Sequence, residues 1–163
     1  MGDVYLRPLA VEDAKTSYKW RNDPLIWKFT GNRPDCVVTE EMERVWANKV
    51  IADSCRANFA ICLKRGDKYI GNIYLIRIDG VRGELGIFIG DRCEHGKGYG
   101  HQALELLKDI AKADLGLREI VIAVRRENLP AIAMYVKSGA RQISSVNDGW
   151  LSGRCVGDRG GDL

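Results

Sequence analysis

The sequence predicts an α+β domain with a mixed central sheet flanked by helices, because two arrangements of strands follow each other along the chain. In the first half, two apolar runs flank Arg65-Gly66-Asp67, a turn typical of an antiparallel hairpin, and a third strand pattern follows. In the second half, a strand, a glycine-rich turn and an amphipathic helix lead into a further apolar run, which is the pattern of a β-α-β unit.

Local signals fix the expected boundaries of each element. Pro8 closes the first strand, Thr39 before Glu40 and Glu41 predicts a helix N-cap, and Gly116 and Gly139 end two later helices. The expected strands span residues 4–9, 58–64, 68–78, 83–89, 119–124 and 141–146, with a short edge strand near 151–156. The expected helices span residues 12–20, 39–53, 100–115 and 128–138.

Two of these elements carry an expectation about burial. The helix over 39–53 should turn an apolar face inward, and the strand over 119–124 is nearly all apolar, as in a strand covered on both faces. The residues expected to face inward from the helix are Met42, Val45, Trp46 and Val50.

Length and charge exclude several classes of protein. A chain of 163 residues with 45% hydrophobic residues fits one globular domain over residues 1–163, with a loose tail from about residue 157. The net charge of +3 is spread along the chain, so no concentrated basic face predicts nucleic-acid binding. No apolar run is long enough to cross a membrane, so we expect no membrane partner.

The cysteines indicate a reducing compartment. Five cysteines with no C-x-x-C pair fit neither a disulfide framework nor a zinc site, so we expect a cytoplasmic protein without a metal.

The glycine-rich turn is the strongest functional signal. Gly96, Gly98 and Gly100 alternate where a strand gives way to a helix. Glycine lets the backbone turn sharply and lets a ligand approach bare N–H groups, and the helix N-terminus adds its partial positive charge. The turn therefore predicts an anion site, with a pyrophosphate as the expected anion.

Two familiar nucleotide motifs do not explain this turn well. Gly96-Lys97 is followed by Gly98 instead of Ser or Thr, so the phosphate loop of NTPases is excluded. Residues 98–103 match G-x-G-x-x-A, but a polar segment separates them from the strand and too little chain remains for a doubly wound sheet.

Two motifs resemble the GNAT superfamily of acyltransferases. Residues 95–100, His-Gly-Lys-Gly-Tyr-Gly, resemble its coenzyme A loop, Arg/Gln-x-x-Gly-x-Gly/Ala, with His95 in the leading position. Asn128, Ala131, Tyr135 and Gly139 reproduce its N-x-x-A-x-x-x-Y-x-x-x-G pattern. The resemblance implies the GNAT fold and an enzyme that transfers the acetyl group of acetyl-CoA directly to a primary amine.

The resemblance also implies a set of coenzyme-binding residues. The strand before the loop pairs its main chain with the pantetheine amides, and the loop holds the pyrophosphate through its N–H groups. In this sequence the implied coenzyme-binding residues are Phe88, Ile89, His95, Gly96, Lys97, Gly98, Tyr99, Gly100, Asn128, Ala131 and Tyr135.

Acetyl transfer to an amine needs proton transfers, and the resemblance suggests two residues for them. Tyr135 matches the tyrosine that protonates the leaving thiolate, although a tyrosine there can also be plain packing. Glu84 matches the general base of histone-acetylating relatives, although a strand glutamate can simply pair with a cation. Glu94 and Glu127 are weaker candidates for the base, and Cys93 has no evident histidine partner for covalent catalysis.

The acceptor side is expected in the N-terminal half, where aromatic and basic residues gather. Aromatic faces stack on sugar rings or bases, and arginine binds phosphates. An amino-sugar nucleotide or other small amine is favoured, a protein N-terminus is the alternative, and a non-catalytic acetyl-CoA sensor is the rival class; a homodimer stays open. The expected acceptor-binding residues are Trp20, Arg21, Asn22, Trp27 and Phe29.

Overall fold

The computed structural model describes residues 2–31, 33–147 and 149–156, apart from the side chains of residues 29, 142, 147 and 156. The tail that we expect from about residue 157 lies outside the described residues. The strands are β1 (Val4–Pro8), β2 (Ala57–Leu63), β3 (Lys68–Ile76), β4 (Arg82–Ile89), β5 (Glu119–Arg125), β6 (Arg141–Asn147) and β7 (Trp150–Val156). The α-helices are α1 (Ala14–Arg21), α2 (Pro24–Thr30), α3 (Glu40–Ala52), α4 (Tyr99–Ala113) and α5 (Leu129–Lys137).

The seven strands form one mixed sheet, as the sequence predicts. Their order is β1-β2-β3-β4-β5-β7-β6. Strands β1 to β4 are antiparallel neighbours, β4 and β5 are parallel, and β7 is antiparallel to both β5 and β6. The helix α4 connects β4 to β5, so the predicted β-α-β unit is confirmed.

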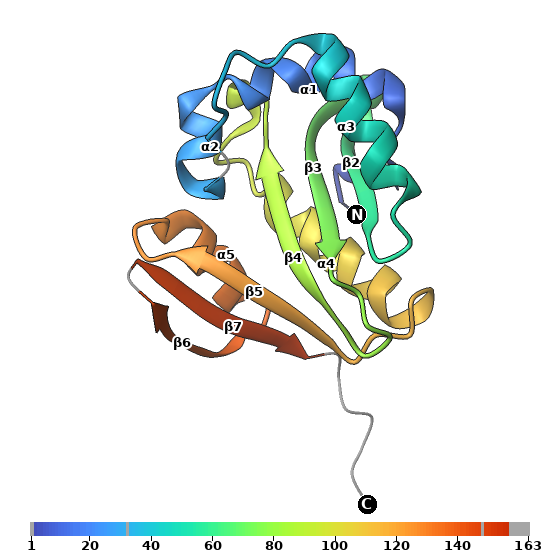
Figure 1. The fold of residues 1–163 in the computed structure, drawn as a ribbon. Helices are drawn as coiled ribbons and strands as arrows, with labels where there is room; N and C mark the ends of the chain where they lie inside the picture. The colour runs from blue at the N-terminus through green and yellow to red at the C-terminus, as the bar shows by residue number, and fades with distance from the viewer. Residues whose placement is uncertain (1, 32, 148, 157–163) are drawn as a thin grey trace, which may run out of the picture.

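Helices cover both faces of this sheet (Figure 1). Helix α3 lies in front of β2 in this view, while α4 lies behind β3 and β4. The inner face of α4 is apolar, and it packs on the sheet in the main hydrophobic core through Ala103, Leu104, Leu107 and Ala111. The described residues contain no helix that is long and apolar enough to cross a membrane.

Several predicted caps are present. The side chain of Thr39 accepts a hydrogen bond from the Met42 N–H at the start of α3, as predicted. Asp23 caps α2 in the same way, with Pro24 in the first turn, where its missing N–H costs nothing. The expected helices do not include residues 25–29, and this cap explains why they form one.

The expected inward face of α3 is wrong in part. Met42 and Val45 are 45% and 61% exposed, whereas Val50 is buried as expected. Glu43 is buried in their place, because its carboxylate accepts a hydrogen bond of 2.8 Å from Ser17 on α1 and faces Arg21. A buried carboxylate with partners replaces the apolar stripe that the pattern suggested.

Two expectations about the C-terminal strands are also corrected. In β5 only alternate residues are buried, since Ala123 faces a cleft instead of a second layer. Strand β7 is not an edge strand: it lies between β5 and β6, because the chain passes the outer position first and then folds back inside.

Candidate active site

A cleft opens where two parallel strands part. Strands β4 and β5 pair only from Arg82↔Glu119 to Leu85↔Ile122. Beyond Leu85, β4 keeps β3 as its neighbour but diverges from β5, as Figure 1 shows. The cleft has a volume of about 890 Å³ and continues to the glycine turn before α4.

The cleft has two ends, which we name by their residues. The Glu84 end comprises Tyr74, Ile76, Arg77 and Glu84, from β3 and β4 and the turn between them. The loop end comprises His95, Gly96, Gly98, Tyr99, Gly100 and His101. Between them lie residues of β4, β5 and α5 and the N-cap of α5, including Phe88, Ile89, Asn128, Ala131, Met134 and Tyr135.

The loop end offers a run of unpaired main-chain donors. Among the described residues, no hydrogen-bond acceptor serves the N–H groups from Gly96 to His101. Helix geometry explains part of this run, because the first turn of α4 has no preceding turn to bond to. Donors that point together at a helix N-terminus favour an anion.

The loop's glycines have distinct structural reasons. Gly96 and Gly98 have φ angles of +73° and +81°, a left-handed conformation that favours glycine, and added Cβ atoms there would meet open space. Gly100 has an ordinary φ but packs closely against α5, where a Cβ atom would lie 3.1 Å from Met134 Sδ.

The side chain of His95 stabilises the loop by contacting the end of β4. Its Nε2 atom lies 2.7 Å from the carbonyl oxygen of Ile89, and a carbonyl can only accept, so Nε2 carries the proton. The ring thus connects the loop to the end of β4. Lys97 is not a cleft-lining residue: its Nζ atom pairs with Glu94 at 2.8 Å.

The second motif positions Tyr135. Asn128 caps α5, since its Oδ1 atom accepts a hydrogen bond of 3.3 Å from the Ala131 N–H. Tyr135 lies two turns later on this helix, is only 5% exposed, and lines the cleft. Burial, with a smaller effect of neighbouring Tyr74, raises the pKa of the Tyr135 phenol, so it keeps its proton at neutral pH.

Glu84 lies in the cleft, but it has a partner. It is on β4 opposite Ile76, and its carboxylate forms an ion pair with Arg77. The other carboxylates are less suitable as bases. Lys97 and Lys68 hold the pKa of Glu94 below its usual value, and Glu127 is 64% exposed outside the cleft.

The sequence pattern does not indicate which residues surround Glu84 in the folded chain. The ring of Tyr74 lies on Gly86, where an added Cβ atom would be only 2.1 Å from Tyr74 Cζ. The guanidinium of Arg56 lies 5.4 Å from the centre of the same ring, and Arg77 comes from the β3–β4 turn. The periodicity that identifies β3 says nothing about which of its side chains share a face with the end of β4.

Three of the residues expected to bind the acceptor make packing or hydrogen-bond contacts and do not line the cleft. Trp20 is 8% exposed and packs on Gly90, where a Cβ atom would lie 2.0 Å from its ring. Asn22 holds the segment before α3 through two hydrogen bonds of 2.8 Å with the main chain of Val38. Arg21 faces Glu43 at 3.7 Å.

The remaining two acceptor candidates are on α2. Trp27 is half-buried and packs under the guanidinium of Arg33, 5.4 Å from the ring centre. The side chain of Phe29 lies outside the described residues. The helix still reaches the cleft, but through Leu25, Ile26 and Thr30.

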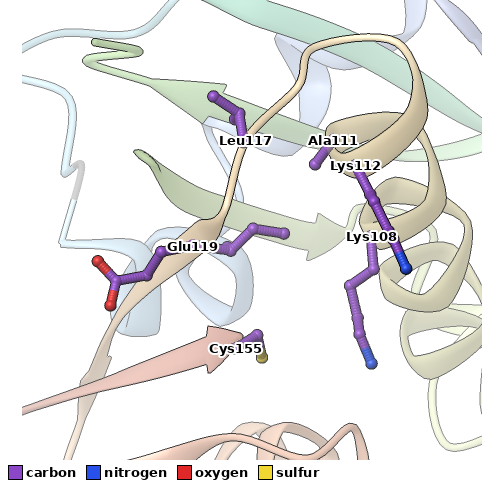
Figure 2. Close-up of a pocket in the computed structure, with 7 residues that line it drawn as sticks. Lys108, Ala111, Lys112, Leu117, Glu119 and Cys155 are labelled. Carbon is purple, nitrogen blue, oxygen red and sulfur yellow. The ribbon is translucent and has the colours of Figure 1, made fainter. Parts of the chain in front are cut away.

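A second cavity lies between α4 and the strands β5 and β7 (Figure 2). Its volume is about 20 Å³, enough for a single water but not for a nucleotide. Lys108, Glu119 and Cys155 are among its lining residues. The candidate active site is therefore the large cleft.

Comparison with known proteins identifies the family. Residues 3–141 match the family model of the acetyltransferase (GNAT) domain. An uncharacterized N-acetyltransferase, p20, of Bacillus licheniformis is 30% identical over 132 residues, which are 79% of this chain and 74% of that protein. The probable N-acetyltransferase YjcK of Bacillus subtilis is 29% identical over 163 residues, covering 90% and 88% of the two chains. The chain belongs to the GNAT family and is an N-acetyltransferase of that family.

Solved structures share the fold. Spermidine N-acetyltransferase from Vibrio cholerae, in complex with CoA and spermine, superposes with a TM-score of 0.80 at 22% identity, covering 93% of both chains. Aminoglycoside acetyltransferase AAC(6')-Ib, in complex with coenzyme A, gives a TM-score of 0.76 at 21% identity, covering 94% of both chains. The predicted GNAT fold is confirmed.

We predict that Gly86→Ala destabilises the protein by about 1–3 kcal/mol, because the methyl group overlaps the Tyr74 ring. In a Tyr74→Ala background the same change should cost less than about 0.5 kcal/mol, since the obstacle is gone. Urea unfolding of the four proteins measures this coupling. Gly83→Ala in the same strand is the control, because its nearest neighbours are side-chain atoms at 3.3 Å. Equal costs of Gly86→Ala in both backgrounds would contradict the contact.

Proposed function

We propose that this protein transfers the acetyl group of acetyl-CoA directly to the primary amine of a small molecule. The observation that carries the proposal is the convergence of three features in one cleft: the parted end of β4, the unpaired N–H groups of the loop, and the side chains of Glu84 and Tyr135. The other assignments below depend on this convergence.

The residues present fit coenzyme A. The N–H groups from Gly96 to His101 would hold the pyrophosphate, and the absence of Cβ atoms at Gly96 and Gly98 leaves room for it. Phe88 and Ile89 would offer main chain to the pantetheine arm by strand addition. Because the Ile89 carbonyl already binds His95, we assign His95 to the support of this strand end and not to the pyrophosphate.

Glu84 would act as the general base of the transfer and Tyr135 as the general acid. The bound thioester supplies the acetyl group. Glu84 accepts a proton from the acceptor ammonium, which frees the nitrogen lone pair. The nitrogen loses its second proton to solvent water as its bond to the acetyl carbon forms and the carbon–sulfur bond breaks. Tyr135, kept protonated by its burial, donates to the departing sulfur and is then reprotonated, so one proton is released overall.

The acceptor is proposed to be a small molecule, such as an amino-sugar nucleotide. The solved relatives named above act on spermidine and on aminoglycosides, which are small amines. A protein N-terminus is the alternative acceptor. The presence of both Glu84 and Tyr135 in the cleft favours an enzyme over a non-catalytic acetyl-CoA sensor.

We predict that acetyl-CoA, but not ATP or NAD, raises the melting temperature, and that Gly98→Asp weakens this binding at least about tenfold. The new carboxylate would repel the phosphates, while Asp is a good N-cap and tolerates the left-handed conformation. Gly116→Asp is the matched control, because Gly116 also has positive φ and open space but follows the far end of α4. Equal affinities of the two variants would contradict the assignment of the loop.

We predict that Tyr135→Phe lowers kcat by about 100-fold or more while the Kd for acetyl-CoA stays unchanged. The phenyl ring keeps the packing of α5, so only the proton donor is lost. Thiol release against a panel of amino sugars, peptides and polyamines, together with calorimetry, measures both quantities. Unchanged turnover would remove Tyr135 from the acid role.

A further inference from the structure

The ion pair between Arg77 and Glu84 lies inside the candidate active site, at the Glu84 end of the cleft. Arg77 Nη1 binds Glu84 Oε2, and both side chains line the cleft. The Arg77 side chain is 74% exposed and that of Glu84 33% exposed, so a molecule in the cleft can reach both.

The backbone fixes Arg77 at this position. Strand β3 ends at Ile76, directly opposite Glu84, and the next residue, Arg77, has a φ of +51°, which is unusual for a residue other than glycine. The turn that follows is held by Asp79, whose side chain accepts hydrogen bonds from the N–H groups of Val81 and Arg82. A strained backbone beside a cleft is a reason to look for a function.

Arg77 conflicts with the role that we propose for Glu84. A base must offer a carboxylate oxygen to the approaching ammonium, but the guanidinium binds one of these oxygens and repels a second cation. Glu94, the other carboxylate that lines the cleft among the described residues, is already held by Lys68 and Lys97. An acceptor that carries only positive charge therefore meets an unfavourable site.

We propose that the acceptor carries an acidic group close to its amine, and that this group takes Arg77 away from Glu84 on binding. The inference rests on the proposed function. The acidic group of the acceptor forms the ion pair with Arg77, and the released carboxylate of Glu84 then faces the amine. Arg77 is thus a specificity-determining residue that couples substrate recognition to the freeing of the base.

The physical chemistry of the pair favours such an exchange. Exposed ion pairs contribute little stability, so Glu84 gives up little when a second anion arrives. Arginine binds carboxylates and phosphates with two parallel hydrogen bonds, which a substrate anion can satisfy. Arg56 does not line the cleft, but its guanidinium lies 5.4 Å from the centre of the Tyr74 ring and adds positive charge behind this end.

Matched pairs of amines test the inference. Thiol release is measured with glucosamine 6-phosphate against glucosamine, and with a peptide that begins Ser-Asp against one that begins Ser-Asn. The wild-type enzyme should favour the acidic member of the pair it acetylates by at least about tenfold in kcat/KM, because that member both binds Arg77 through two hydrogen bonds and frees the Glu84 base. Arg77→Ala should reduce this preference to about twofold or less, mainly by raising KM for the acidic member.

Two further variants make the result specific. Arg82→Ala removes an arginine that pairs with Asp79 in the same turn but does not line the cleft, so it should leave the preference unchanged. Arg77→Glu should shift the preference toward spermidine.

Failure of the Arg77 inference can be distinguished from failure of the proposed function. Turnover without an acid preference in the wild type, or a preference that survives Arg77→Ala, overturns this inference and leaves the proposed function standing. Failure of acetyl-CoA to raise the melting temperature of the wild type overturns the proposed function itself.

Discussion

The main chain of β4 imposes the constraint on which the rest of the site depends. Polar backbone groups that leave water need hydrogen-bond partners, and a strand inside a sheet normally finds them on both sides. After Leu85, β4 has β3 on one side but no longer has β5 on the other. The chain satisfies one of the exposed groups itself, through the ring of His95 on the Ile89 carbonyl. The remaining main chain, with the donors of the adjacent loop, is suited to a ligand that supplies amides and phosphates.

A ligand that is bound by main-chain groups requires few particular side chains. The loop needs left-handed residues at Gly96 and Gly98 and a close approach at Gly100, and the chain has glycine at all three. His95 stands where the resemblance to the family leads one to expect Arg or Gln. In this chain that histidine has taken over a structural contact.

Two glycines, one in β4 and one just after it, leave room for aromatic rings against the main chain. Gly86 and Gly90 have no Cβ, and the rings of Tyr74 and Trp20 occupy the space. The aromatic side chains therefore lie against the strand in place of its own side chains. Asp23 of the α1–α2 connection also forms an ion pair with Arg92, just before the glycine loop. The Asp23–Arg92 pair connects the N-terminal helices to the loop that we assign to the coenzyme.

Much of this architecture could be predicted from the sequence, because its causes are local. Thr39, the Arg65-Gly66-Asp67 turn and the periodicity of α4 each act within a few residues. The errors concern contacts across the sheet or between helices. Nothing near Glu43 indicates that it is buried opposite Ser17, and nothing near Arg77 indicates that it meets Glu84. The residue types of the Trp20–Asn22 segment suit both ligand binding and packing, and the sequence alone does not indicate the packing contacts that the segment makes.

Amide hydrogen exchange with and without acetyl-CoA tests the central claim most directly, since it reports on the main-chain groups themselves. We expect exchange to slow at Gly86–Ile89 and at Gly96–His101 when acetyl-CoA is added, while the amides of β1 and β2 are unaffected. ATP should produce no such pattern. Protection elsewhere, or none in these two segments, would contradict the claim that the parted strand and its loop hold the coenzyme.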